Sequence, residues 1–224
     1  MDGIKSSPGE SFIAAESRRM ELLADKSRVR VDDCGTGKGG YRRVCRIVRS
    51  AAVGRKYGLL LAYFAARAGE GPIIEMGTSL GISTFYLALS NRKAHILTIE
   101  GCSSIAGIAL EGFRKQGLEN IEPIVGNFDV HLDEVAGKQP GPGLVFIDGN
   151  HRGDALMRYF RSVAGVAGHD TVLIADDIDY SLSMARAWRT LRSDARVSES
   201  IDMGRMGIVF FRRYKSGIHY RIRY

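Results

Sequence analysis

The chain has 224 residues, of which 45% are hydrophobic, and it carries a formal net charge of +7. This length suits one α/β domain with one buried core. No apolar run approaches the roughly 18 residues of a membrane-spanning helix, and the polar first residues lack the order of a secretion signal. We therefore expect a cytoplasmic protein with no membrane segment.

The positive charge lies mainly at the two ends of the chain. Residues 1–56 hold 13 Lys/Arg against 7 Asp/Glu, and residues 212–224 hold 5 basic residues and no acidic one. Proteins that grip a phosphate backbone usually cluster basic side chains beside their site, so this distribution argues against a nucleic-acid partner. Cys34, Cys45 and Cys102 are spaced for neither a disulfide framework nor a zinc site, and we expect reduced thiols.

The first 55 residues are predicted to form helices and a lid. Four apolar residues of the segment 11–26 fall near one helical face: Phe12, Ile13, Met20 and Leu23. A second helical stretch lies within residues 44–69. The glycine-rich loop between them is not a phosphate-binding P-loop, because Lys38 is followed by Gly39 rather than by a hydroxyl residue. We expect residues 27–43 to form a flexible lid.

From residue 56 onward, strand-like and helical patterns alternate. Five short apolar runs are typical of strands covered on both faces: 72–76, 95–100, 121–126, 143–148 and 171–176. Helical spacing of apolar residues occurs in four segments: 82–89, 105–113, 156–163 and 184–191. The alternation predicts an α/β fold with a doubly wound, Rossmann-like, mostly parallel sheet.

The end of the core departs from this alternation. Two strand-like runs, 196–201 and 207–212, are joined by a turn too short for a helix, which predicts a C-terminal antiparallel hairpin. We expect a single domain over residues 1–224, with N-terminal helices in 1–55, the Rossmann-like core in 56–212 and a basic tail in 213–224.

The turn after the first predicted core strand indicates a nucleoside site. Gly77 and Gly81 remove side chains where a ligand must approach the backbone, but the middle glycine of a dinucleotide fingerprint is missing. Glu100 ends the next strand, nineteen residues beyond Gly81, where a carboxylate can accept both ribose hydroxyls. The pattern favours a nucleoside without a diphosphate.

These residues resemble the class I S-adenosylmethionine-dependent methyltransferases. The stretch EMGTSLG is similar to their first motif, E-x-G-x-x-x-G. The stretches LVFIDGNH and VLIADDI narrow the resemblance to small-molecule O-methyltransferases, which carry D-G-[DN] after strand four and D-[DN] after strand five. The resemblance covers about residues 56–212. It implies a seven-stranded sheet whose last strand is reversed.

The resemblance also implies which residues hold S-adenosylmethionine. Glu75 and Gly77 would face its methionine part, Thr78 and Ser79 would offer hydroxyl groups, and Glu100 would bind the ribose. Asn127 and Phe128 would contact the adenine edge and face. The implied cofactor set, with Asp148 added, is Glu75, Gly77, Thr78, Ser79, Gly81, Glu100, Asn127, Phe128 and Asp148. Each polar or aromatic member also has a structural alternative, such as a helix cap, a turn or the core.

The acids at the ends of two later strands suggest a metal site. Asp148, Asp176 and Asp177 should meet at one edge of the sheet, and three close carboxylates repel one another unless a cation lies among them. In the family that the sequence resembles, this trio holds a divalent ion, here Mg²⁺ or else Mn²⁺ or Ca²⁺. The alternative is that Asp176 caps a helix and Asp148 contacts only the cofactor.

The candidate catalytic residues are Asp148 and His151. Some relatives carry a second aspartate where this chain has Asn150, and an amide cannot accept a proton at neutral pH. The imidazole of His151 can, although a histidine at this place also serves as a hydrogen-bonding residue at a helix start.

Three functions remain open from the sequence. The favoured one is methylation of a hydroxyl group on a small-molecule acceptor. The alternatives are methylation of RNA or protein and a cofactor-binding module without catalysis. Self-association as a homo-oligomer stays open, and the acceptor is not identified by any motif.

Overall fold

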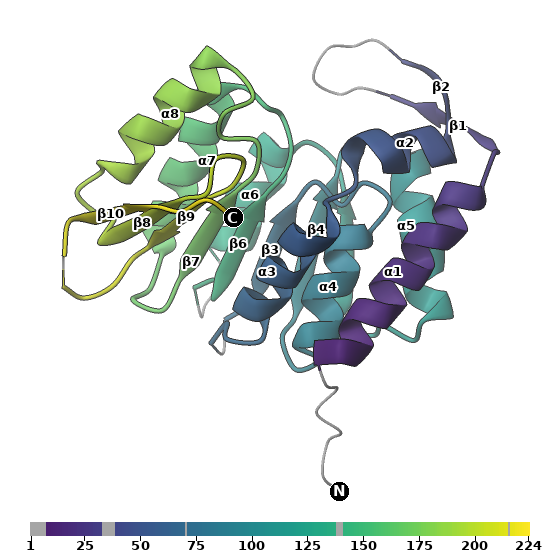
Figure 1. Cartoon of the computed structure of the whole chain (residues 1–224), viewed down its shortest axis with the longest axis horizontal. Helices are drawn as coiled ribbons and strands as arrows, with labels where there is room; N and C mark the ends of the chain where they lie inside the picture. Colours follow the sequence, from purple (N-terminus) through teal and green to yellow (C-terminus); the bar gives the residue numbers. More distant parts are fainter. Residues whose placement is uncertain (1–7, 33–38, 70, 138–140, 215) are drawn as a thin grey trace, which may run out of the picture. The chain divides into compact units, whose positions relative to one another are not determined.

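The computed structural model describes residues 8–32, 39–69, 71–137, 141–214 and 216–224. The chain divides into two compact units (Figure 1). The first unit comprises residues up to 67 together with 78–127, and the second comprises 68–77 together with 128–224.

The first unit holds helices around a parallel strand pair. In chain order its elements are α1 (Pro8–Ala24), β1 (Arg28–Val31), β2 (Gly40–Arg43), α2 (Val44–Ala51), α3 (Arg55–Ala65), α4 (Ile82–Ser90), β4 (Ile96–Glu100), α5 (Ser103–Lys115) and β5 (Ile121–Val125). β4 and β5 pair in parallel, whereas β1 and β2 form a separate antiparallel sheet. Helices α1 and α3 both pack against α4.

The second unit contains most of the strands. Its elements are β3 (Ile73–Met76), α6 (Phe128–Ala136), β6 (Leu144–Ile147), α7 (Gly153–Val166), β7 (Val172–Ala175), α8 (Leu182–Arg192), β8 (Glu199–Asp202), β9 (Gly207–Phe210) and β10 (Ile218–Arg221). β3, β6 and β7 are parallel, and β9 runs antiparallel to both β7 and β8. β10 pairs in parallel with β8 at the edge.

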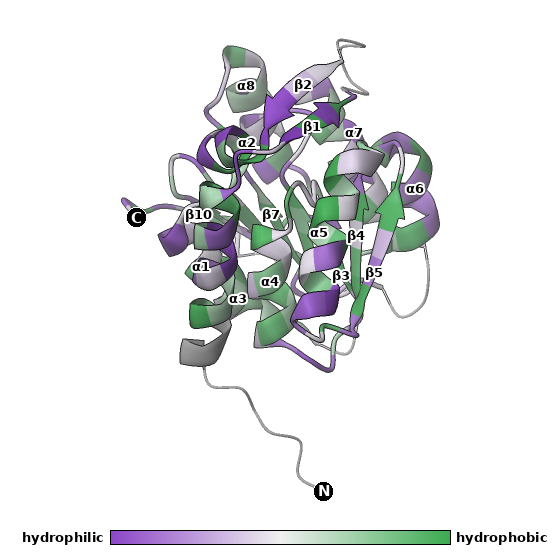
Figure 2. Ribbon diagram, turned by 90° about the vertical axis from the view of Figure 1, so that its right-hand side faces the viewer, coloured by the Kyte–Doolittle hydropathy of each residue, from purple (hydrophilic) through white to green (hydrophobic). Residues whose placement is uncertain are grey.

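The central strands are buried along their whole length. All four residues of β3 and of β6 are buried, which explains why their sequences are apolar without alternation. Figure 2 shows most of β4 in green and most of β2 in purple. In the first unit, α4 buries every residue from Ile82 to Leu89.

The five predicted core strands are confirmed within one residue at each end, and the final hairpin within three. The predicted number of strands is wrong. Among the described residues the sheet has eight strands, in the order β10-β8-β9-β7-β6-β3-β4-β5. The extra strand is β10, which lies in the tail that the sequence marks only as basic. Its four residues are all exposed, so the sequence shows no apolar run there of the kind that marks a buried strand.

Two expectations for the N-terminal region need correction. The segment predicted as a loop contains the strands β1 and β2, although residues 33–38, and with them Cys34 and Lys38, lie outside the described residues. Helix α1 does not bury the predicted face, because Ile13 and Met20 are 64% and 65% exposed. Its buried positions are Ala15, Arg18 and Leu22. The sequence does not show this face as apolar because it includes the charged residue Arg18. The Arg18 guanidinium is buried there and donates a hydrogen bond to the Ile108 carbonyl.

Candidate functional site

Gly77 directly follows β3, at a position where the structure has no room for a side chain. Its φ is +109°, and a Cβ built there would collide with the carbonyl oxygen of Asp148 in the same unit. The amide of Asp148 donates to the Met76 carbonyl, which fixes this close approach. The glycine is therefore required by the packing of two strand ends, in addition to any ligand that comes near.

Gly81 has a separate role in the first unit. It is the N-cap of α4 with φ +85°, and a Cβ there would lie 2.7 Å from the ring of Phe113. The first-motif glycine thus allows a left-handed turn and close packing of α4 on α5 at once.

Glu100 lies at the carboxyl end of β4 and is held by two backbone amides. Its Oε2 accepts from Ser79 N at 2.8 Å, and its Oε1 accepts from Cys102 N at 2.9 Å. Ser79 has φ +48°, a strained conformation for serine that this hydrogen bond supports. A carboxylate has about four acceptor positions, so each oxygen of Glu100 can still accept a hydroxyl. The side chain is partly exposed.

The two hydroxyl residues of the turn have different environments. Thr78 is 2% exposed, and its Oγ1 lies 2.6 Å from Thr98 Oγ1. This contact uses the Thr78 hydroxyl inside the unit, and the Thr78 amide donates to the Ile99 carbonyl. Ser79 is partly exposed, so its side chain is the more accessible of the two.

The remaining predicted cofactor residues lie at strand ends or in the core. Glu75 is fully buried in β3, opposite Phe146 of β6. Asn127 is exposed in the first unit, just after β5. Phe128 begins α6, where its ring lies edge-on to Tyr159 at a centroid distance of 6.1 Å. A Cβ on Gly149 would collide with this ring, so Phe128 packs against the backbone after β6.

A second group of chemical side chains gathers at the ends of β6 and β7. Asp148, His151 and Asp177 each offer a ligand atom within 4.8 Å of the others. His151 Nδ1 lies 3.5 Å from Asp177 Oδ2, and these side chains are 37% and 24% exposed. Asp177 has φ +53°, in the left-handed region that aspartate tolerates better than most residues. The group is open enough for a cation to enter.

Asp176 is committed to another partner, Arg205. Its carboxylate is fully buried and receives two bonds, from Arg205 Nε to Oδ1 at 2.8 Å and from Nη2 to Oδ2 at 2.6 Å. Asp177 N also donates to Asp176 Oδ1 at 2.8 Å, and Arg205 Nε lies 3.2 Å from Asp177 Oδ1. Arg205 comes from the short turn between β8 and β9, and the sequence analysis did not single it out.

Burial and mutual repulsion perturb the acids of this group. Desolvation, and then the charges of Asp176 and Asp177, raise the pKa of Asp148 well above its ordinary value. Desolvation and Asp176 also raise the pKa of Asp177, against the opposing effect of Arg205 and His151. A bound cation would favour the ionised form of both carboxyls, so the site suits a positive ligand.

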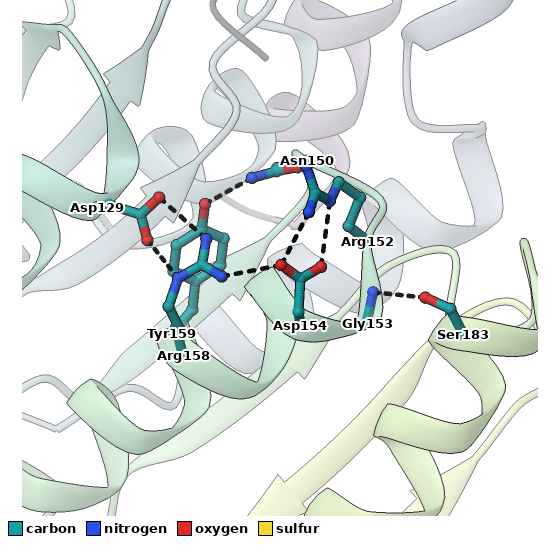
Figure 3. A network of polar contacts seen from close by, with 8 residues as sticks. All are labelled: Asp129, Asn150, Arg152, Gly153, Asp154, Arg158, Tyr159 and Ser183. Atoms are coloured by element: carbon teal, nitrogen blue, oxygen red, sulfur yellow. Dashed lines mark hydrogen bonds and ion pairs between the residues drawn. The ribbon is translucent and has the colours of Figure 1, made fainter. Parts of the chain in front are cut away.

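Asn150 is a structural residue in the loop after β6. Its φ is +52°, and its Nδ2 donates to Tyr159 OH at 3.0 Å (Figure 3). The amide thus joins this loop to α7. The Asn150 side chain is therefore engaged in a hydrogen bond to the Tyr159 phenol.

An ion-pair network beside this loop joins the first turns of α7 to α6. Arg158 binds Asp129 of α6 at 2.9 Å and Asp154 at 3.1 Å, and Arg152 also binds Asp154. Figure 3 shows these carboxylates on either side of the Arg158 guanidinium. The pairs are substantially exposed, so each contributes little free energy, and they join residues that flank the loop carrying His151.

Comparisons with known proteins agree with this geometry. Residues 74–178 match a family described as a methyltransferase domain. Over this segment the chain is similar to a methyltransferase domain. The matched segment runs from β3 to just beyond β7, and it includes both the Glu100 turn and the group of Asp148, His151 and Asp177. No curated protein is similar enough in sequence to match.

Solved structures resemble the chain over most of its length. The O-methyltransferase TomG from Streptomyces achromogenes, involved in tomaymycin synthesis and solved with SAM, has a TM-score of 0.66 at 19% identity, covering 91% of this chain and 90% of that one. An O-methyltransferase from Bacillus cereus in complex with SAH scores 0.60 at 21% identity, covering 72% and 83%. A SAH-bound methyltransferase from Podospora anserina scores 0.65 at 15% identity, covering 94% and 90%. At these identities the likeness establishes the fold.

The described part of the chain includes no helix with the length and apolar character needed to cross a membrane. Cys45 and Cys102 are buried free thiols, as expected.

Proposed function

We propose that this chain is a methyltransferase that transfers a methyl group from S-adenosylmethionine to a hydroxyl group on a small molecule. The observation that carries the proposal is the pair of hydrogen bonds that two backbone amides donate to the Glu100 carboxylate. They hold the carboxylate rigidly at the end of β4, with one acceptor position of each oxygen still available. Adjacent hydroxyls, such as the 2′ and 3′ hydroxyls of a ribose, match two such acceptors.

The other residues proposed for the cofactor would contact its two ends. Glu75, Gly77 and Ser79 would lie toward its methionine part, and Asn127 and Phe128 would lie toward its adenine, as the sequence motif implies. When bound, S-adenosylmethionine supplies an electrophilic methyl group on a sulfonium sulfur. The task of the chain is to hold the acceptor oxygen in line with that group and to exclude water.

The acidic group fits a divalent cation. Two carboxylates and one imidazole, partly exposed and with raised carboxyl pKa values, form a donor set that suits Mn²⁺ or Mg²⁺. We propose Asp148, His151 and Asp177 as the ligands. Asp176, which the sequence placed in this trio, would support the site through the Asp177 amide and Arg205. A bound cation would act as a Lewis acid toward the acceptor hydroxyl.

His151 has a second use that competes with metal binding. Its Nδ1 faces the Asp177 carboxylate, which orients the ring and leaves Nε2 for a proton. In that arrangement His151 accepts the proton of the acceptor hydroxyl, and Asp177 stabilises the resulting imidazolium. The requirement for metal distinguishes the two uses, because a base with no metal keeps its activity after chelation.

Two experiments test the function. Calorimetry measures binding of S-adenosylmethionine and its demethylated product, and absence of both would end the proposal. Methyl transfer is then measured over a panel of catechols, phenols and aliphatic alcohols, with a chelator and with Mg²⁺ or Mn²⁺ restored. Binding without turnover on any acceptor would favour the alternative of a non-catalytic module. Turnover restricted to RNA or protein would replace the small-molecule acceptor.

The location and the lid also remain proposals. We propose a cytoplasmic location, which the buried free thiols Cys45 and Cys102 support. We propose that the segment 27–43 closes over a bound ligand. Its described part is the β1–β2 hairpin, where Asp32 N lies 3.5 Å from Cys102 Sγ, two residues after Glu100.

A further inference from the structure

A cavity of about 540 Å³ lies in the first unit between the β1–β2 hairpin and α2. Four arginines line it: Arg28, Arg42, Arg43 and Arg46. Tyr41 and Ser50 complete its wall, and the buried side chain of Ile47 contributes an apolar surface. Figure 1 shows the hairpin beside α2. None of these residues belongs to the Glu100 turn or to the acidic group, so the cavity is a separate feature.

Among the residues that the structure describes, no carboxylate neutralises the arginines of the cavity. Within the described residues, no ion pair involves any of the four, whereas arginines close by in sequence are paired, as Arg19 is with Glu16 and Arg30 with Asp32. Arg28 lies over the Tyr41 ring at 5.8 Å, which is a contact with an aromatic face and adds no negative charge. Four guanidinium groups around one cavity repel one another, and an anion between them would remove that repulsion.

The position of two of these arginines on α2 opposes the helix dipole. Arg43 is the N-cap, Arg46 lies in the first turn, and that turn contains no acidic residue. The N-terminal end of a helix carries partial positive charge, where cations are unfavourable and anions are favoured. Arginines at the N-terminal end of a helix are locally unfavourable, and such an unfavourable placement beside a cavity is typical of a binding site.

The backbone holds this arrangement in place. The amides of Val44 and Cys45, at the start of α2, donate to the carbonyls of Ser27 and Asp25 at 3.0 Å each. The register of the hairpin places Arg28 opposite Arg43 and Val29 opposite Arg42. The backbone positions of three of the four arginines are therefore set by strand pairing and by the helix start, which keeps their side chains near one another in the hairpin.

We propose that this open cavity binds the phosphate or diphosphate group of a small molecule. Its four arginines, Tyr41 and Ser50 are all exposed. Guanidinium groups bind phosphate oxygens in pairs of parallel hydrogen bonds, and Ser50 and Tyr41 offer hydroxyl groups beside them. A single carboxylate would leave most of the positive charge uncompensated, whereas a diphosphate carries two or three negative charges. The cavity volume lies in the range of small-molecule sites, and its concave form differs from the extended basic surface that tracks a nucleic-acid backbone.

The test measures binding of inorganic pyrophosphate and of phosphate to the full chain by calorimetry at constant ionic strength, without cofactor. The variant is Arg43→Gln combined with Arg46→Gln. The matched control is Arg49→Gln, which changes an exposed arginine of the same helix that does not line the cavity. We expect pyrophosphate to bind more tightly than phosphate. The double variant should lose roughly 10- to 100-fold in affinity for pyrophosphate, and the control should change less than about twofold.

Three results would overturn the proposal. The first is no pyrophosphate binding to the unaltered chain. The second is an equal loss in the double variant and in Arg49→Gln, which would show only a general charge effect. The third is binding of a single-stranded RNA oligomer that pyrophosphate fails to displace, which would assign the surface to nucleic acid. Circular dichroism and thermal melting establish that each variant is folded. Since the readout needs neither cofactor nor methyl transfer, it stands or falls separately from the proposed function.

Discussion

Arg205 and Asp176 form a two-point ion pair in the second unit, with N···O distances of 2.8 and 2.6 Å, in which the carboxylate is fully buried and the guanidinium is 38% exposed. Because of this ion pair, the neighbouring acids have different roles. Asp176 is neutralised by the protein itself, while Asp148 and Asp177 remain close together with His151. The doublet Asp176–Asp177 therefore has one structural and one accessible member.

Removing the guanidinium should destabilise the fold. Arg205→Ala leaves the buried Asp176 carboxylate with only the Asp177 amide, and we expect a loss of about 2–3 kcal/mol in the free energy of unfolding, below the loss for a completely buried pair because Arg205 is partly exposed. Urea unfolding measures this, with Arg152→Ala as the exposed control. A loss under about 0.5 kcal/mol would show that the pair does not neutralise Asp176 as described.

Asp148 should make the metal-free protein less stable as the pH rises. Its folded-state pKa is raised above the ordinary value near 3.8, so the folded state binds more protons than the unfolded state between 3.8 and the raised value. Stability then falls with increasing pH through that window. Asp148→Asn removes this slope, and we expect the variant to be more stable than the unaltered chain at pH 7.5 with a chelator present. Denaturant unfolding from pH 4 to 8 tests the sign, which would be wrong if Asp148→Asn is less stable throughout.

A divalent cation should reverse that penalty in the unaltered chain. Binding to the folded state adds about 2.7 kcal/mol when the free metal is at 100 times its Kd. We expect Mn²⁺ or Mg²⁺ to raise the melting temperature of the unaltered chain and of the exposed-site control Asp170→Asn, and to have little effect on Asp148→Asn or Asp177→Asn. Equal responses from all four proteins would show that the metal binds elsewhere or not at all. Turnover before and after chelation then decides whether the metal takes part in the reaction.

The β1–β2 hairpin should become more protected when ligand binds. Its contact with the core passes through Cys102, whose thiol lies 3.6 Å from the Arg30 carbonyl and whose amide binds Glu100. Ligand on Glu100 should therefore slow amide exchange in residues 28–31 and 40–43. Hydrogen exchange with and without S-adenosylmethionine measures this, with β10 as the internal reference. Exchange that stays equally fast in the hairpin with cofactor and an acceptor present would rule out a lid.

The sequence predicted the parts of the fold that burial dictates. β3, β4, β6 and β7 are covered on both faces, so their apolar runs are visible without any other information. β2 and β10 consist entirely of exposed residues and half of β1 is exposed, so the same signal is absent there. Exposed strands are set by pairing with a neighbour, which a single sequence does not display.

The candidate site divides in the same way. Glu100 was predicted because its place after a strand has a local signature, and the structure puts it at the end of β4 with Ser79 and Cys102 as donors. Arg205 comes from 29 positions beyond Asp176, and nothing local to either residue indicates their contact. The cavity of arginines was visible only as a basic N-terminal region. Long-range pairing of charged side chains requires the tertiary structure.

The central claim is that the chain binds S-adenosylmethionine through Glu100, and calorimetric titration of the cofactor into the unaltered chain, Glu100→Ala and Glu111→Ala tests it most directly. Glu111 is an exposed carboxylate on α5 and serves as the matched control. We predict measurable binding to the unaltered chain, a roughly 10- to 100-fold loss for Glu100→Ala and less than about a twofold change for Glu111→Ala. Full affinity in a folded Glu100→Ala protein, or no binding to the unaltered chain, would contradict the claim.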